Sequence, residues 1–119
     1  MKTLKLSEII KHLELKVECG GKFLDRTITG GYVSDLLSDV MANATKGDIW
    51  VTMQCHPNIV AVGVLKEING IVITNGRKPE SETVKKAEQE KIPIMTTELP
   101  AFEVVGRLYE MEISGSREK

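Results

Sequence analysis

Cys55 and His56 stand next to each other and offer a thiol and an imidazole, the groups that a cysteine nucleophile and its general base require. Adjacent side chains of an extended segment point to opposite faces, so this pair does not have the geometry of a nucleophile and its base. A cysteine in apolar surroundings is more often a small core residue. With no third residue to orient a base, the sequence predicts that the chain is not an enzyme.

The glycine pair Gly30-Gly31 closes a hydroxyl-rich segment at residues 27–31. Tyr32 and Val33 follow it, so it is neither a Walker loop nor a Gly-x-Gly-x-x-Gly fingerprint. Two interpretations stay open. The loop binds an anion through backbone N–H groups at the start of a helix, or its glycines only permit positive φ angles and close helix–sheet approach.

Metal binding is not predicted either. The two histidines, His12 and His56, and the scattered carboxylates do not have the close ligand spacing of a zinc site. No cofactor is indicated by any motif. The remaining candidate chemistry is the binding of an anionic small molecule by loop amides, hydroxyls and imidazole.

Length, composition and charge limit the class of protein to which these residues belong. A chain of 119 residues, 41% hydrophobic and 28% charged, predicts one globular domain, here residues 1–113, with a flexible polar tail at residues 114–119. A formal charge of -1 without a basic stripe argues against nucleic acid as a partner. No segment approaches the roughly 20 apolar residues that span a bilayer. Two widely spaced cysteines predict reduced thiols in the cytoplasm.

The first third of the chain predicts a helix, a strand and a turn. Ser7 is suited to cap a short helix, and apolar and charged residues then alternate over residues 15–19, as in a half-buried strand. Gly20-Gly21 supplies a turn, and residues 22–26 are expected to return as a brief strand. The glycine-rich loop follows and leads to a helix that Ser34 caps.

The rest of the chain repeats a short apolar run, a polar loop and a helix-compatible segment. Residues 59–67 have strand propensities, but we expect a helix there, because consecutive parallel strands need a crossover connection. The fold class predicted is therefore α/β, with a mostly parallel sheet flanked by helices. The strands are expected at residues 49–53, 70–74 and 93–97, and the helices at residues 34–47, 59–67, 81–91 and from Pro100 onward.

The carboxyl ends of parallel strands share one edge, where ligands usually bind. Residues 54–58, 75–78 and 97–99 should meet there. We expect one cleft that also takes in the glycine-rich loop, with Arg26 and Arg77 at its rim. The alternatives are that His56 only bonds the loop backbone and that Asn75 is only part of a turn. The predicted ligand-binding residues are Arg26, Thr27, Thr29, Gly30, Gly31, Gln54, His56, Asn58 and Asn75.

Several blocks of this sequence match a known family: Asp25, Arg26, Thr27, Gly30 and Gly31, then Ser34 to Ser38, Gly47-Asp48, Trp50 to Val62 and Pro93 to Glu110. These blocks resemble the DRTGG domain. The resemblance implies a fold similar to that of the N-terminal domain of HPr kinase/phosphorylase. Such domains occur beside CBS domains in some inorganic pyrophosphatases and at the front of some phosphotransacetylases, as regulatory or dimerising modules. No catalytic residue carries over.

Two functions of different kinds fit this chain. The first is a non-catalytic regulatory module that senses a nucleotide or another anionic metabolite. The alternative is a homodimerising interaction module that docks onto a metabolic or redox enzyme. We expect a homodimer because a small chain has too little core to bury Tyr32, Met41, Trp50 and Met53 alone.

Overall fold

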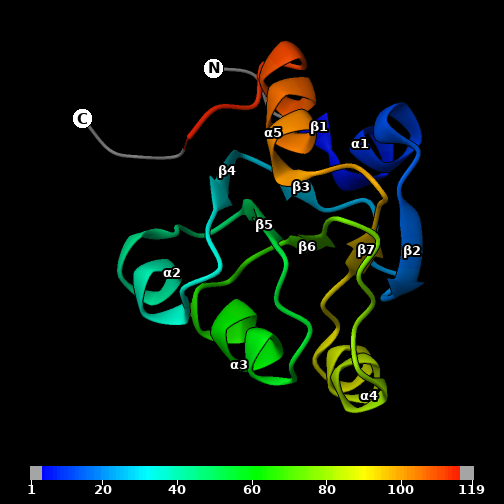
Figure 1. The fold of residues 1–119 in the computed structure, drawn as a ribbon, viewed down its shortest axis with the longest axis vertical. Coiled ribbons are helices and arrows are strands. Elements are labelled where there is room, and N and C mark those ends of the chain that lie inside the picture. The colour runs from blue at the N-terminus through cyan, green and yellow to red at the C-terminus, as the bar shows by residue number, and fades with distance from the viewer. Residues whose placement is uncertain (1–3, 116–119) are drawn as a thin grey trace.

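The computed structural model describes residues 4–115, which form a three-layered α/β domain (Figure 1). A five-stranded sheet with the order β2-β7-β6-β5-β4 lies at its centre. The prediction of a mostly parallel sheet is confirmed, because within this sheet of the described residues only the pairing of β2 with β7 is antiparallel. The strands are β2 (Lys16–Cys19), β4 (Gly30–Val33), β5 (Asp48–Thr52), β6 (Gly70–Ile73) and β7 (Ile94–Thr96).

Helices cover both faces of the sheet (Figure 1). The three that connect consecutive parallel strands pack on one face, and the first and last helices pack on the other with a short antiparallel ribbon. The first set is α2 (Leu37–Asn43), α3 (Asn58–Leu65) and α4 (Ser81–Glu90). The second set is α1 (Leu6–Leu13) and α5 (Ala101–Glu110), with the ribbon of β1 (Leu4–Lys5) and β3 (Thr27–Ile28).

The central strands are buried on both sides, as expected for a sheet between two helical layers. Alternate residues of β5 enter different cores: Trp50 faces α2, α3 and α4, whereas Ile49 and Val51 face α1 and α5. Trp50 is completely buried, and its indole N–H donates to the carbonyl of Ser34 at 2.9 Å. Trp50 therefore gives no reason for a dimer, contrary to the expectation from sequence.

The segment at residues 59–67 is largely helical, and the prediction of a helix there is confirmed by α3. Its β-branched residues adopt the helix because Ile59, Val60 and Val62 become buried against the sheet. Burial of this apolar surface outweighs the weak strand preference of the same residues.

The strand predicted at residues 22–26 is wrong. Its carbonyl groups bond the first turn of α1 instead of a neighbouring strand, since the N–H groups of Leu6 and Ser7 donate to the carbonyls of Arg26 and Leu24, each at 2.8 Å. The segment thus satisfies helix N–H groups that have no partner within the helix. Strand pairing begins only at Thr27, which lies opposite Lys5.

Candidate functional site

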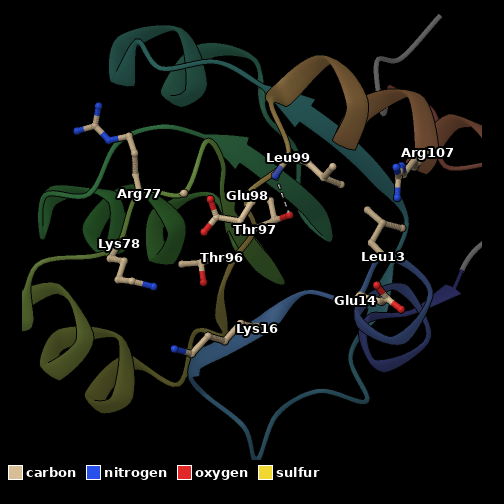
Figure 2. A pocket seen from close by; sticks show the side chains of 11 residues that line it. Leu13, Glu14, Lys16, Arg77, Lys78, Thr96, Thr97, Glu98, Leu99 and Arg107 are labelled. Carbon is tan, nitrogen blue, oxygen red and sulfur yellow. Dashed lines mark hydrogen bonds between the residues drawn. The ribbon is translucent and has the colours of Figure 1, made fainter.

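The loops after β6 and β7 meet at the carboxyl edge of the sheet, as the sequence predicted. The N–H of Gly76 donates to the carbonyl of Thr97, and the N–H of Asn75 donates to the carbonyl of Leu99, both at 2.9 Å. Next to these loops lies a cavity of about 300 Å³ that β2, the end of α1 and α5 complete (Figure 2). We call this cavity the basic pocket.

Basic side chains outnumber acidic ones around the basic pocket. Lys16, Arg77, Lys78 and Arg107 line it, against the carboxylates of Glu14 and Glu98. Neither Arg77 nor Lys78 forms an ion pair with any residue between 4 and 115, whereas Arg107 lies 3.7 Å from Glu103. An open pocket with this excess of positive charge attracts anions.

Backbone geometry holds the two loops in place. Asn75 and Gly76 have φ angles of 63° and 70°, the left-handed conformation that a tight turn after β6 uses. A Cβ atom on Gly76 would lie 2.6 Å from Oε1 of Glu98, so the glycine leaves room for that carboxylate. The Thr97 hydroxyl accepts the N–H of Leu99 at 3.1 Å, a bond drawn in Figure 2. The two loops therefore form one connected wall of the pocket.

The predicted residues after β5 and β6 lie at this same edge but do not line the basic pocket. The Gln54 amide donates to the carbonyl of Asp35 at 2.8 Å, and Nδ1 of His56 accepts the N–H of Asn58 at 3.0 Å. The Asn75 side chain accepts the hydroxyl of Thr74 at 2.8 Å. The side chains of His56 and Asn75 bond their own loops, which is the interpretation of these two residues that needs no ligand, and Gln54 bonds the segment between β4 and α2. Ligand contacts by these residues stay a prediction.

The glycine-rich segment lies at the opposite end of the sheet, so the predicted shared cleft is wrong. Gly30 is paired with Asp48, the first residue of β5, whereas His56 follows the last residue of β5. The two groups of residues are separated by the length of the strand. The segment is also a strand and not a loop, because Gly30 and Gly31 both belong to β4.

Gly31 has neither of the two features that require a glycine, a positive φ angle or a neighbour too close for a Cβ atom. Its φ angle is not positive, and an added Cβ would meet Ile49 at 3.6 Å, an ordinary van der Waals distance. Its N–H already donates to the carbonyl of Ser114 at 3.0 Å, and Gly31 forms an isolated bridge with Gly115. This amide is therefore engaged by the chain itself. Ser114 and Gly115, the described part of the predicted tail, lie along β4; residues 116–119 lie outside the described residues.

The other residues of the motif build the corner between β3 and β4. The carbonyl of Thr27 accepts the Asn69 side chain at 3.0 Å, and the N–H of Thr29 donates to the carbonyl of Gly47 at 3.1 Å. Gly47 has a φ of 88°, and a Cβ there would collide with the Thr29 hydroxyl. The guanidinium of Arg26 lies over the ring of Phe23. These contacts give the motif a structural role at the amino edge of the sheet.

The thiols also have structural surroundings. Cys19 is buried, and desolvation raises its pKa from 9.0 to about 11, so the thiol stays protonated at neutral pH. The carbonyl of Cys55 accepts the hydroxyl of Thr83 at 2.7 Å and the N–H of Glu80 at 3.1 Å, which fixes the start of α4. In the part of the chain that the structure describes, no group of three His, Cys, Asp or Glu side chains could hold a metal ion.

Sequence reasoning found the two loops and placed Arg77 at the rim, but it missed Lys16 and Arg107. Lys16 looked like the exposed residue of an alternating strand, and Arg107 like the polar face of an amphipathic helix. The signal that they belong together is the antiparallel register of β2 and β7, in which Lys16 lies opposite Thr96. That register is not readable from local sequence patterns.

The fold and the pocket define an α/β module with a basic site at the carboxyl edge of a mostly parallel sheet. A sequence model of the DRTGG domain matches residues 8–111. The chain therefore belongs to the DRTGG domain family. A comparison with curated protein sequences found no match.

One solved structure supports the same fold. It is the crystal structure of the CBS and DRTGG domains of the regulatory region of Clostridium perfringens pyrophosphatase, complexed with the activator diadenosine tetraphosphate. The TM-score is 0.69 at 18% sequence identity. The match covers 92% of this chain and 47% of that one, so this chain spans about half of the length of the neighbour.

Proposed function

We propose that this chain is a non-catalytic regulatory module that binds an anionic metabolite, with nucleotides as the favoured class, in the basic pocket. The observation that carries this proposal is the excess of basic residues, Lys16, Arg77, Lys78 and Arg107, in the lining of a cavity of about 300 Å³. Cavities of this size take small ligands, and a few placed charged groups orient them. The site lies outside the carboxyl ends of parallel strands, the usual place for ligands in open α/β sheets.

The family membership supports a regulatory role. The structurally similar DRTGG and CBS domains belong to the regulatory region of a pyrophosphatase and were crystallised with a nucleotide activator. The absence of a catalytic role is part of the proposal. It is supported by the positions of Cys55 and His56, whose loop contacts anchor α3 and α4.

A thermal-shift screen of nucleotides and phosphorylated metabolites tests this function. A ligand that binds only the native state at tenfold excess over its Kd should raise the Tm by about 5 °C. The shift should disappear in Lys78→Glu and persist in Lys85→Glu, which changes an exposed lysine on α4 that does not line the basic pocket. A screen in which no anionic compound raises the Tm would refute the proposal.

We also propose that the chain forms a homodimer through α3, which is the interaction-module alternative. This helix contains no charged residue, although Val64 and Leu65 on its outer face are 42% and 68% exposed. A helix that is apolar all round is normally buried. A cavity of about 250 Å³ between α3 and α4 extends this surface. A second copy of the chain would cover it.

Light scattering tests the dimer. We expect twice the 13.2 kDa mass of one chain at micromolar concentration. Leu65→Lys should give the monomer, whereas Leu36→Lys, at a leucine of similar exposure on another surface, should leave the dimer intact. A mass of one chain for the unchanged protein at all concentrations would end this proposal.

We place the module in the cytoplasm. This proposal is supported by Cys19 and Cys55, which are both free thiols in the structure. Between residues 4 and 115, no helix is long and apolar enough to cross a membrane.

A further inference from the structure

One end of the basic pocket has the chemistry of a phosphate site. Lys16 on β2 lies opposite Thr96 on β7, and its side chain is 68% exposed. Its ammonium group lies 3.9 Å from the carboxylate of Glu18, which also accepts the Thr96 hydroxyl at 2.7 Å. Lys16 is therefore partly neutralised, and Lys78 is the cation at this end without an ion pair to any residue between 4 and 115. In Figure 2 the side chains of Lys16 and Lys78 extend toward each other beside Thr96. Lysine ammonium groups act as compact point charges with several donors, which suits phosphate oxygens.

The other end of the pocket has apolar walls and a planar cation. Leu99 is half-buried and packs on a hydrophobic cluster that contains the buried Leu13, and Arg107 extends beside them from α5. Figure 2 shows these three side chains on the far side of Thr97 from Lys16 and Lys78. Aliphatic side chains with an adjacent guanidinium plane form a surface on which an aromatic base can stack.

The middle and rim of the pocket are acidic in part. Glu98 stands in the loop between the two ends, and Glu14 follows Leu13. A carboxylate accepts hydroxyl and amino donors but repels phosphate. A polyanion that filled the whole pocket would meet both carboxylates, whereas a ligand with phosphate at one end and hydroxyl and amino groups elsewhere would not.

We infer that the ligand of the basic pocket is a mononucleotide, with its phosphate groups between Lys16 and Lys78, its ribose hydroxyls at Glu98 and its base against Leu13, Leu99 and Arg107. This inference rests on the proposed function and gives it a ligand class and an orientation. The three chemical parts of a mononucleotide occur in the same order as the three kinds of wall in the pocket. The volume of about 300 Å³ is sufficient for one nucleoside unit.

Calorimetric titrations with ADP, GDP, CDP, UDP and inorganic pyrophosphate test the inference. At least one nucleoside diphosphate should bind about tenfold or more tightly than pyrophosphate, which carries the same phosphates without ribose or base. Arg107→Gln should weaken that nucleotide about tenfold and leave pyrophosphate unchanged. Lys78→Gln should weaken both ligands by a similar factor.

The outcomes separate this inference from the proposed function. Equal affinity for pyrophosphate and the nucleotides, or an equal loss of both in Arg107→Gln, would overturn the mononucleotide orientation while leaving an anion site. If no nucleotide bound but the screen returned another anionic compound, the inference would be wrong and the proposed function would stand. If no anionic compound bound at all, both would fail. Circular dichroism of each variant controls for its fold.

Discussion

Replacing Gly20 by Ala is expected to lower the free energy of unfolding by about 3 kcal/mol, the scale of a strained backbone combined with an overpacked contact. Gly20 ends the strand region of β2 with a φ of 78°. A Cβ atom there would lie 2.6 Å from Cα of Pro93 and 2.8 Å from its backbone nitrogen. Neither backbone can retreat easily, because β2 and β7 are paired directly beside this point.

Gly21 is the matched control, since it is the neighbouring glycine and a Cβ on it would meet nothing within 4 Å. Gly21→Ala is expected to change the free energy of unfolding by less than about 0.5 kcal/mol. Urea unfolding followed by circular dichroism measures both variants. Equal effects of the two substitutions would contradict the described approach of Gly20 to Pro93, and with it the placement of β2 that brings Lys16 to the pocket.

The double variant Lys16→Glu with Lys78→Glu is expected to weaken ADP binding about 100-fold, which is about 2.7 kcal/mol. Each substitution removes an ammonium group from the phosphate end and adds a charge that repels phosphate. Both lysines are exposed, so the fold should tolerate the change. Lys16 also lies 3.9 Å from Glu18, whose side chain is only 16% exposed and accepts the Thr96 hydroxyl at 2.7 Å, so circular dichroism must show that the double variant is folded before its affinity is compared. Isothermal titration calorimetry gives the affinity.

The control is Lys22→Glu with Lys85→Glu, which changes the net charge of the protein by the same amount at exposed positions outside the basic pocket. This double variant should bind ADP within about twofold of the unchanged protein once salt screens distant charges. A similar loss of affinity in both double variants would show a general charge effect instead of a phosphate site.

The repeating units of the fold could be predicted because they depend on local patterns. The runs at residues 49–53, 70–74 and 93–97 are apolar without alternation, as in strands buried on both faces, and β5, β6 and β7 occupy them. The helix at α3 followed from the need for a crossover in spite of its β-branched residues. The meeting of the loops after β6 and β7 followed from the same parallel order.

The glycine-rich segment could not be placed correctly, because paired glycines suggest a loop wherever they occur. Gly30 and Gly31 instead begin a strand, which moves Thr27 and Thr29 to the amino edge of the sheet. That position depends on the partner strand β5, which local propensity does not reveal.

The complete set of residues that line the basic pocket could not be predicted from the sequence either. Lys16 reaches it only because β2 runs antiparallel to β7, and Arg107 only because α5 packs beside the end of α1. Both arrangements are long-range. Loop residues rich in hydrogen-bonding groups, such as Gln54 and His56, are typical of ligand sites, but His56 bonds its own loop and Gln54 bonds the segment between β4 and α2.

The claim that a nucleotide binds in the basic pocket is tested most directly by a nuclear magnetic resonance titration of the isotope-labelled chain with ADP. This titration reports where the ligand binds. The basic pocket predicts that the largest amide shifts fall on residues 76–78 and 96–99, with Lys16 and Arg107 also moving. Small shifts are expected at Gly30 and Gly31, at the other end of the sheet. Saturable shifts centred on residues 27–31, or no saturable shift at all, would contradict a nucleotide site in the basic pocket.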